Sequence, residues 1–499
     1  MSMKSKIDDT IGNIGFLSNG AMPYLAFGLV FLLFHICADP IWSEFLLRLF
    51  ILFAILCVVT VGVFLYRAVR LNHERAIFLT ITIGVLIRLV YVIYTDIYTR
   101  QHDIVWSGNT GHIGYIMHIA QHLRLPDTNQ NIFYHAPLHH LISGTFYRIN
   151  EFFGMNTVRN MESLQYLTAF YSSCLMVVAY RIFRKLDIKD APLLMSTAIV
   201  ALHPTMFILA GSINNDMLTL LLNAAALLWL IYWYDSPDIK NTVVLAIFVG
   251  AAVMTKMSGG LIALVVAPVF LIKFFRSQSK KSLAAKLALF GAVSLPIGLW
   301  YHIRNLILFK QPIGYFLPLG ESYVLYTGEI PLVDRIFSIP MSEMFKGIYS
   351  ITWDGAYNLP VFVMKSSIFG EWSFRSEMDI LAITLLSLNI ILIIVSLAAM
   401  TCLITNRQKE ERGGAWFLFL IWFTQMAMFL YYNIKFPYSP NMDFRYIPLT
   451  LICGAGFIGL ACGNIPEKHS ALWKKARRCV FVLAACFCAN AALFYMFVY

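Results

Sequence analysis

Residues 94–154 are the first long polar interruption in a very apolar sequence, and they read YTDIYTRQHDIVWSGNTGHIGYIMHIAQHLRLPDTNQNIFYHAPLHHLISGTFYRINEFFG. This loop carries seven histidines, three arginines and four carboxylates, which are Asp96, Asp103, Asp127 and Glu151. Hydrophobic runs of membrane-spanning length flank it. Because ionisable groups at a membrane are costly, their concentration beside a span indicates a functional site. The rest of the chain is expected to supply a membrane scaffold around this loop.

The composition sets the class of protein. The 499 residues are 59% hydrophobic and only 13% charged, whereas a soluble domain carries about a quarter charged residues. Repeated apolar runs predict an all-α polytopic membrane protein. The net charge of +11 does not indicate nucleic-acid binding, because many basic residues gather in short loops between spans. We expect no cleavable signal peptide, and we interpret the nine cysteines as mostly buried apolar side chains.

The apolar pattern predicts about thirteen spans, with the N-terminus inside and the C-terminus outside. The spans are expected at about 21–38, 46–66, 76–94, 160–180, 190–211, 217–233, 241–257, 259–274, 287–302, 379–405, 415–434, 446–464 and 479–498. The loops that carry basic residues are expected on the inner side of the membrane, and this gives the direction of each span. Late in the opening loop, a short amphipathic stretch from Pro137 to about Phe153 is predicted to lie at the interface as a helix. This topology places the polar segments of the chain on one outer face.

Asp103, in the motif Arg100-Gln-His102-Asp103, is the strongest candidate for a chemical role. A carboxylate just past the end of a span can take a proton from an acceptor hydroxyl at the membrane surface. Arg100 and His102 are candidates for substrate contacts beside it. Asp103 is favoured over Asp96, which lies closer to the helix end. The alternative is an ordinary solvated acid that pairs with Arg100.

The sequence Phe-Tyr-His135-Ala-Pro137-Leu-His139-His140 is dense in imidazole. Three histidines invite a zinc site, but Pro137 disturbs the regular presentation of His135 and His139. Hydrogen bonds from these two histidines to a phosphate or sugar are the favoured interpretation, and plain interfacial histidines remain the alternative.

Other polar residues of the outer face are candidates for ligand binding. Asn215 and Asp216 close one outward span and open the next, where they either cap the following helix or bind sugar or acceptor hydroxyls. Lys256 interrupts an apolar hairpin and either snorkels to the surface or faces a cavity and binds phosphate. Further cations expected on this face are Arg304, Lys365 and Arg445. Several cations would stabilise the charge that builds on a departing lipid phosphate.

A span, an acidic motif early in the first outer loop and a Pro-Leu motif before an interfacial helix together resemble the GT-C membrane glycosyltransferases. The likeness covers roughly residues 76–460 and is to the protein O-mannosyltransferase-like and aminoarabinose-transferase-like bacterial enzymes. It implies that Asp103 activates the acceptor. His135 stands where that family often has the lysine of a Lys-Pro-Pro-Leu motif, which leaves its phosphate role open. The Asn-Asn-Asp216 element, Thr255-Lys256 and the WYHIRN and DFRYIP stretches also look like family features.

The pattern of spans and loops, together with the resemblance, predicts four regions. They are a cytoplasmic segment with an extra hairpin (1–75), a catalytic membrane core with the first outer loop at 95–159 (76–302), an outer interfacial lobe (303–378) and C-terminal membrane helices (379–499).

The resulting hypothesis is inverting transfer of a sugar from a polyprenyl-phosphate donor to an acceptor hydroxyl on the outer face of a membrane. The membrane is expected to be a bacterial plasma membrane, and the acceptor is a glycan, lipid or protein. No cofactor is predicted, although the resemblance leaves a divalent metal open. The alternatives are a transporter or flippase, and an O-antigen-ligase or polymerase-type enzyme that uses a diphosphate carrier.

Overall fold

The computed structural model describes residues 17–18, 20–37, 72–97, 110–128, 132–316, 320, 323, 325–340, 344–345, 357–370, 372, 374–405, 413–463 and 471–498. Within these residues the chain is helical, and its one extended contact is an isolated bridge between Tyr326 and Tyr438. The α-helices are α2 Met22–Cys37, α4 His73–Tyr94, α5 Gly111–His122, α6 Leu138–Phe152, α7 Thr157–Lys185, α8 Asp190–Ala201, α9 Pro204–Gly211, α10 Asp216–Asp235, α11 Ile239–Thr255, α12 Ala263–Arg276, α13 Lys280–Phe309, α14 Leu332–Ile336, α16 Leu359–Phe369, α17 Asp379–Thr405, α18 Gly413–Lys435, α19 Leu449–Gly463 and α20 Ala471–Phe497. Four short 3₁₀ helices are η1 Met257–Ile262, η2 Ser376–Met378, η3 Ser439–Met442 and η4 Phe444–Tyr446. The all-α prediction is confirmed.

Eight helices of the described residues are long and apolar enough to cross a membrane, and the number is nine if the bent pair α8–α9 counts as one span. The chain is therefore a multi-pass membrane protein. Three further expected spans coincide with the shorter apolar helices α2, α11 and α19. The expected span at 46–66 lies outside the described residues, so the count of about thirteen stays a prediction.

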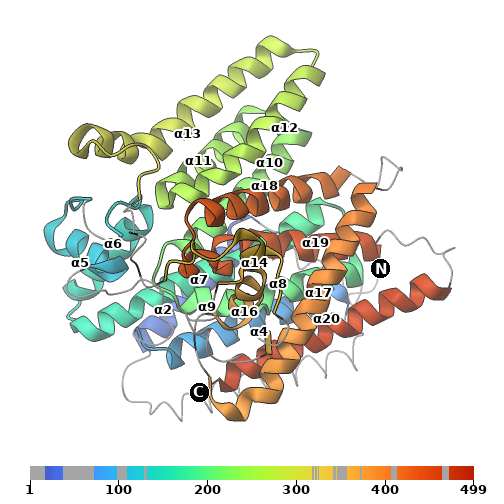
Figure 1. The fold of residues 1–499 in the computed structure, drawn as a ribbon. Coiled ribbons are helices and arrows are strands. Elements are labelled where there is room, and N and C mark those ends of the chain that lie inside the picture. Colours follow the sequence, from blue (N-terminus) through green and yellow to red (C-terminus); the bar gives the residue numbers. More distant parts are fainter. Residues whose placement is uncertain are drawn as a thin grey trace, which may run out of the picture.

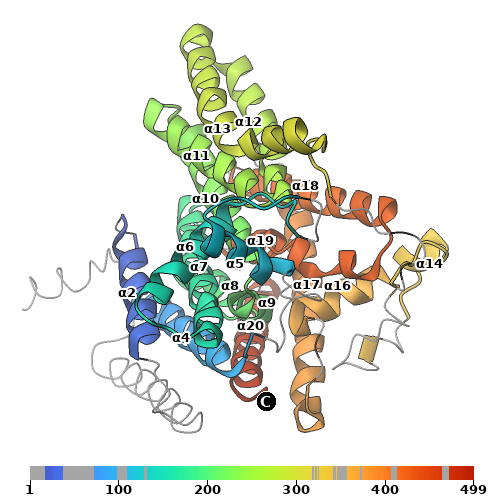
Figure 2. The same cartoon turned by 90° about the vertical axis from the view of Figure 1, so that its left-hand side faces the viewer.

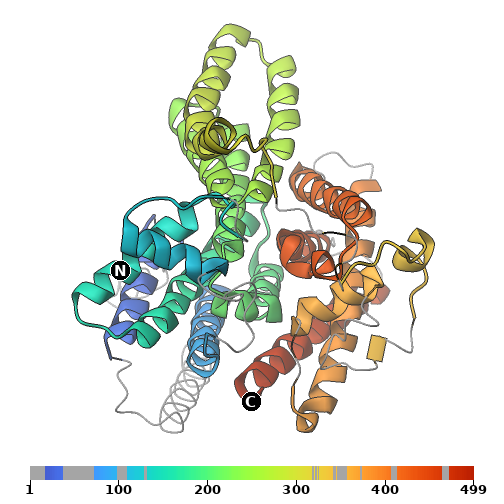
Figure 3. The same ribbon diagram turned by 60° about the vertical axis from the view of Figure 1, so that its left-hand side comes forward.

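Helix α7 lies at the centre of the fold and packs against α2, α4, α8, α9 and α10 (Figure 1). Helices α10 to α13 form a group that projects from the rest of the molecule (Figure 2). Helices α5 and α6 pack on each other to one side, whereas α17 to α20 lie on the other side (Figure 3). The interfacial helix expected after Pro137 is α6. Helix α5 was not predicted from the sequence.

The span at 190–211 is broken, and a buried arginine stabilises the break. Helices α8 and α9 meet at 41°, because Pro204 cannot continue the hydrogen-bond ladder of the preceding helix. Arg88 of α4 is fully buried and donates to the carbonyl oxygens of Ala201 and Gly84, each at 2.8 Å, and to Ser172 Oγ at 2.8 Å. The carbonyl freed at the end of α8 is thereby satisfied inside the membrane core. Helix α9 then leads the chain toward the start of α10.

The segment 303–378 is only partly described. Helix α13 continues to Phe309 and so extends past the expected boundary at 302. Helix α16 is mostly buried and contacts α9, α17 and η4. The division of the chain into four regions remains a prediction.

Candidate functional site

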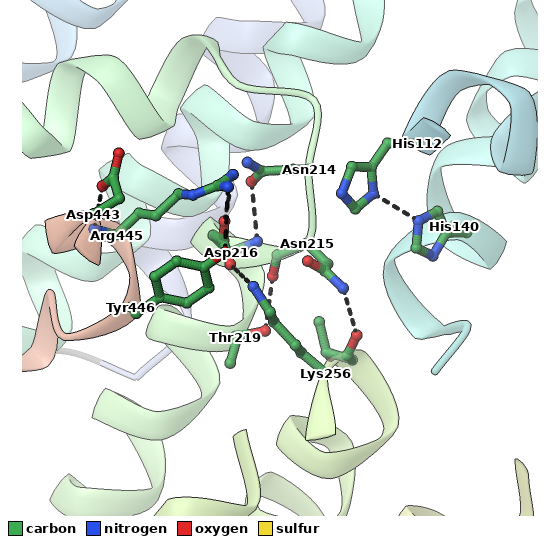
Figure 4. Close-up of polar contacts among 11 residues, drawn as sticks. His112, His140, Asn214, Asn215, Asp216, Thr219, Lys256, Asp443, Arg445 and Tyr446 are labelled. Atoms are coloured by element: carbon green, nitrogen blue, oxygen red, sulfur yellow. Dashed lines mark hydrogen bonds and ion pairs between the residues drawn. The ribbon is translucent and has the colours of Figure 1, made fainter. Parts of the chain in front are cut away.

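Three charged side chains from distant parts of the sequence meet at one end of the spans (Figure 4). Lys256 Nζ donates to Asp216 Oδ1, and Arg445 NH1 lies 3.8 Å from Asp216 Oδ2. The side chains of Asp216 and Arg445 are 5% and 6% exposed, and that of Lys256 is 13% exposed. A buried carboxylate that contacts two cations is protected from the cost of an isolated charge. We call these residues the 216–256–445 cluster.

The backbone around Lys256 is held by contacts between two helix ends. Asn215 Nδ2 donates to the carbonyl oxygen of Thr255 at 3.1 Å, and the Asp216 amide donates to Asn214 Oδ1 at 3.1 Å. The turn after Lys256 depends on Gly259, because a Cβ there would lie 2.7 Å from the carbonyl carbon of Ala252. The sequence also allowed Asn215 to cap helix α10. In the structure its side chain makes no capping hydrogen bond to the first turn of that helix. Asn215 instead links α10 to α11.

Arg445 is presented by η4, a short turn between α18 and α19. The turn begins where the Arg445 amide donates to Asp443 Oδ1 at 2.7 Å. The ring of Tyr446 lies beside both cations, with Lys256 Nζ 5.0 Å and Arg445 Cζ 5.1 Å from its centroid. An aromatic face attracts cations electrostatically, so Tyr446 helps to keep both positive groups together.

A small cavity of about 30 Å³ opens beside the cluster. Of its lining residues, two are cationic (Lys256 and Arg445) and one is a carboxylate (Asp216), so positive charge is in excess. Neutral polar groups complete the lining, among them Thr219, Asn223, Ser258 and Gln425. The volume suits one or two water molecules. A phosphate can enter only if a side chain moves, and Lys256 is the most exposed member of the cluster.

A set of stacked aromatic rings from α5 and α6 faces the cluster. His112 Nδ1 lies 2.9 Å from His140 Nε2, and the ring of Tyr115 stacks on His140 with centroids 4.0 Å apart. Tyr115 donates to the hydroxyl of Tyr301 on α13 at 3.2 Å. Burial holds the pKa of His112 well below its usual value, and His135, His139 and the nearby cations Lys256 and Arg445 lower it further. His112 is therefore a neutral imidazole beside a positively charged cavity.

The two histidines predicted from the sequence lie within this set. The ring of His135 stacks on that of His112 with centroids 6.1 Å apart. His139 is fully buried, and desolvation lowers its pKa to about 4, against a smaller upward effect of Asp216. His135 and His139 therefore belong to the same set of rings as His112, and Asp216 of the 216–256–445 cluster acts electrostatically on His139.

Other predicted site residues lie elsewhere. Asp103, Arg100 and His102 lie outside the described residues. Arg304 is half-exposed near the end of α13, where it bonds Asn305 Oδ1 at 3.0 Å and covers the rings of Tyr301 and Phe309. Lys365 is buried on α16, and its neighbour Ser366 accepts from the amide of Phe444 at 2.9 Å. The helix that carries Lys365 therefore contacts the η4 turn.

The sequence analysis missed His112, His140 and Tyr446 as members of this region. His112 and His140 are 28 residues apart, so their contact depends on the packing of α5 against α6. Tyr446 could have been noticed, because it directly follows Arg445 in the DFRYIP stretch. Among the described residues, no group of three or more His, Cys, Asp or Glu side chains is arranged to hold a metal ion. Asp216 is already paired with two cations, which would repel a divalent ion. We derive no step through a metal.

Comparisons with known proteins identify what the chain is similar to. Residues 113–318 match the family model described as dolichyl-phosphate-mannose-protein mannosyltransferase. Among solved structures, the chain is similar to archaeal oligosaccharyltransferase AglB from Archaeoglobus fulgidus in complex with an inhibitory peptide and a dolichol-phosphate. The TM-score is 0.50 and the identity is 14%, over 85% of this chain and 56% of the AglB chain.

The chain has the fold of the GT-C membrane glycosyltransferases. The resemblance stated from the sequence is thus confirmed, and both the family model and AglB describe enzymes that transfer sugars. A further GT-C neighbour is ArnT from Cupriavidus metallidurans bound to undecaprenyl phosphate, with a TM-score of 0.48 and 13% identity over 84% of this chain and 75% of ArnT. No protein with a curated description matches the sequence. The chain spans about half the length of AglB, with 56% covered.

Proposed function

We propose that this protein is an inverting glycosyltransferase of a bacterial plasma membrane. It takes a sugar from a polyprenyl-phosphate carrier and transfers it to an acceptor hydroxyl on the outer face. The matched family model is named for a dolichyl-phosphate sugar donor, and AglB was solved with a dolichol-phosphate. Both carriers are polyprenyl phosphates, which supports this class of donor.

The 216–256–445 cluster is the observation that carries the proposal. A lipid-phosphate donor places its phosphate where its isoprenoid chain leaves the membrane, and the cluster lies where α10, η1 and η4 meet at the ends of apolar helices. Negative charge develops on the phosphate as the bond to the sugar breaks. Two cations held in a mostly buried site stabilise that charge more strongly than they would in water.

Binding of the donor exchanges one ion pair for another. In the structure Lys256 bonds Asp216, and the cavity is too small for a phosphate. We expect Lys256 to turn from Asp216 to the phosphate, while Arg445 contacts both anions. Asp216 thus keeps the two cations in place before the donor arrives. A cation already paired with a carboxylate costs less to bury than an isolated one.

His112 and His135 are proposed to contact the donor from the other side. A neutral imidazole has one N–H donor and one acceptor, so His112 can use one ring nitrogen for His140 and the other for the donor. Being neutral, it adds no charge that would hold the product phosphate too tightly. His135 stacks on His112 and occupies the position of the family lysine, so we expect a hydrogen bond rather than an ion pair from it.

The transfer step needs a base on the acceptor side. The acceptor oxygen forms a bond to the anomeric carbon while the bond from that carbon to the phosphate oxygen breaks. The hydroxyl proton passes to the Asp103 carboxylate, and the electron pair of the broken bond remains on the polyprenyl phosphate. Attack opposite the leaving group inverts the anomeric centre. Asp103 follows α4 by nine residues, and its role stays a proposal from the sequence.

Transfer of radiolabelled sugar from a panel of polyprenyl-phosphate sugars tests this function. Purified protein in lipid is expected to release polyprenyl phosphate from at least one donor, and Asp103→Asn is expected to reduce the rate at least 100-fold. Polyprenyl-diphosphate sugars form the second arm. Turnover of those donors alone would favour the ligase or polymerase alternative. Absence of turnover in folded protein, together with movement of lipid-linked sugar across the bilayer, would favour the flippase.

A further inference from the structure

A second polar cavity, of about 250 Å³, lies between α2, the end of α4 and the beginning of α7. It is smaller than the roughly 300–1,000 Å³ of sites for drug-sized ligands. A single sugar ring is a ligand of suitable size. The residues that line it are different from those around the 216–256–445 cluster.

The chemistry of the lining combines acceptors with donors. Asp96 and Glu162 supply carboxylate oxygens, whereas Arg159 supplies guanidinium N–H groups. Tyr94 and Tyr166 add aromatic rings. A hydroxyl group both donates and accepts hydrogen bonds, so a polyhydroxylated ring can use carboxylates and donors together. A simple cation could use only the carboxylates, and an anion only the donors.

Gln165 gives an independent indication of a ligand. Its side chain lines the cavity and is 1% exposed, and among the described residues its Nε2 has no hydrogen-bond partner. A buried amide donor without an acceptor is energetically costly. Because the Nε2 atom is itself buried, a ligand oxygen satisfies it only when the side chain turns toward the cavity.

Helix α2 closes one side of this cavity. His35 lines it, bonds Asn150 Oδ1 through Nε2 at 2.9 Å and packs its ring 5.9 Å from that of Tyr166. Helix α2 belongs to the hairpin that the sequence analysis treated as an extra element. The structure therefore gives at least part of this extra region a place at a binding cavity.

One apolar cluster links the two sides of the molecule. Ile97, the residue after Asp96, belongs with Leu164 and Ile213 to one buried cluster. Ile213 directly precedes the Asn214–Asp216 segment, which the proposed function assigns to donor binding.

We propose that the cavity binds a sugar ring of the acceptor, so that the acceptor is a saccharide or a glycan-bearing molecule. This inference rests on the proposed function and adds the class of acceptor to it. The carboxylates Asp96 and Glu162 accept hydrogen bonds from ring hydroxyls, and Gln165 donates one. Helix α2 makes the cavity selective by closing its far wall.

Ligand-observed saturation-transfer NMR with methyl glycosides tests the proposal. The probes are the methyl glycosides of glucose, galactose, mannose and N-acetylglucosamine, added to the full chain in nanodiscs. At least one is expected to bind, and both Glu162→Gln and Gln165→Leu are expected to weaken it at least tenfold. Lys256→Met, which changes only the donor side, is expected to leave this binding unchanged. Thermal unfolding checks that each variant is folded.

Two results would overturn the proposal. One is the absence of binding by all four glycosides to folded protein, and the other is equal binding by the wild type and both cavity variants. Donor turnover measured in the same preparation separates this failure from that of the proposed function. Turnover without glycoside binding refutes the acceptor cavity alone, whereas glycoside binding without turnover of any lipid-phosphate sugar refutes the donor chemistry alone.

Discussion

Replacing Lys256 by methionine tests the role of the 216–256–445 cluster. The change removes one of the two cations and keeps the length of the side chain. Two unit charges about 4 Å apart interact by about 4 kcal/mol at an effective dielectric constant of about 20. Loss of one charged donor to a developing anion typically lowers the rate by about 10²- to 10³-fold. We therefore expect kcat/KM for the lipid-phosphate donor to fall by about that factor.

A second variant separates charge from geometry. Lys256→Met removes the Lys256 partner of Asp216 and leaves the 3.8 Å contact to Arg445, so the carboxylate then repels the incoming phosphate more strongly. Adding Asp216→Asn removes this repulsion and restores one excess positive charge. The double variant is expected to recover about tenfold of the lost activity, which would appear as a non-additive double-mutant cycle.

The chain offers a matched control for this experiment. Lys273 lies on the same hairpin, donates to the carbonyl oxygen of Tyr234 at 2.6 Å and lies 4.8 Å from the centroid of that tyrosine ring. Lys273→Met thus removes a similar lysine that is not part of the cluster. Its activity is expected to stay within about twofold of the wild type, because substitutions far from the reacting groups usually have small effects. Full activity in Lys256→Met, or equal loss in both lysine variants, would refute the reasoning.

Three further predictions concern the scaffold. Gly259→Ala places a methyl group against the carbonyl of Ala252. This change is expected to lower donor turnover at least tenfold. Unchanged turnover would show that the turn tolerates a side chain. Arg88→Met leaves the Ala201 carbonyl unsatisfied and is expected to lower the free energy of unfolding by about 2–4 kcal/mol, measured by denaturant titration in detergent. His139 has a folded pKa of about 4, below that of an exposed imidazole. The unfolded state therefore binds more protons between about pH 6.5 and 4, so stability is full above 6.5 and falls as the pH drops through that range. His139→Asn should flatten this part of the stability profile, and an unaltered profile would contradict the assignment.

The sequence singled out the three residues of the 216–256–445 cluster because their signals are local. Asp216, Lys256 and Arg445 each stand in a polar interruption at the end of an apolar run, and the positive-inside pattern assigns all three to one face. The structure brings these three residues together. Arg304 was assigned to the same face, and its contacts in the structure are with Asn305, Tyr301 and Phe309, so its role stays a prediction.

Features that depend on packing could not be read from the sequence. The contact between His112 and His140 needs α5 to lie against α6, and nothing in the pattern predicted α5. Pro204 signals the break in its span, but the arginine that stabilises the break comes from a helix more than a hundred residues earlier. The cavity at Gln165 combines α2, α4 and α7 in the same way. These features arise where segments far apart in the sequence pack together, so the residue types in any one segment do not reveal them.

A structure of the full chain with a bound polyprenyl phosphate tests the central claim most directly. The account predicts that the phosphate lies within hydrogen-bonding distance of Lys256 and Arg445, with Lys256 turned away from Asp216. A phosphate bound elsewhere, with the contact between Lys256 and Asp216 intact, would contradict it.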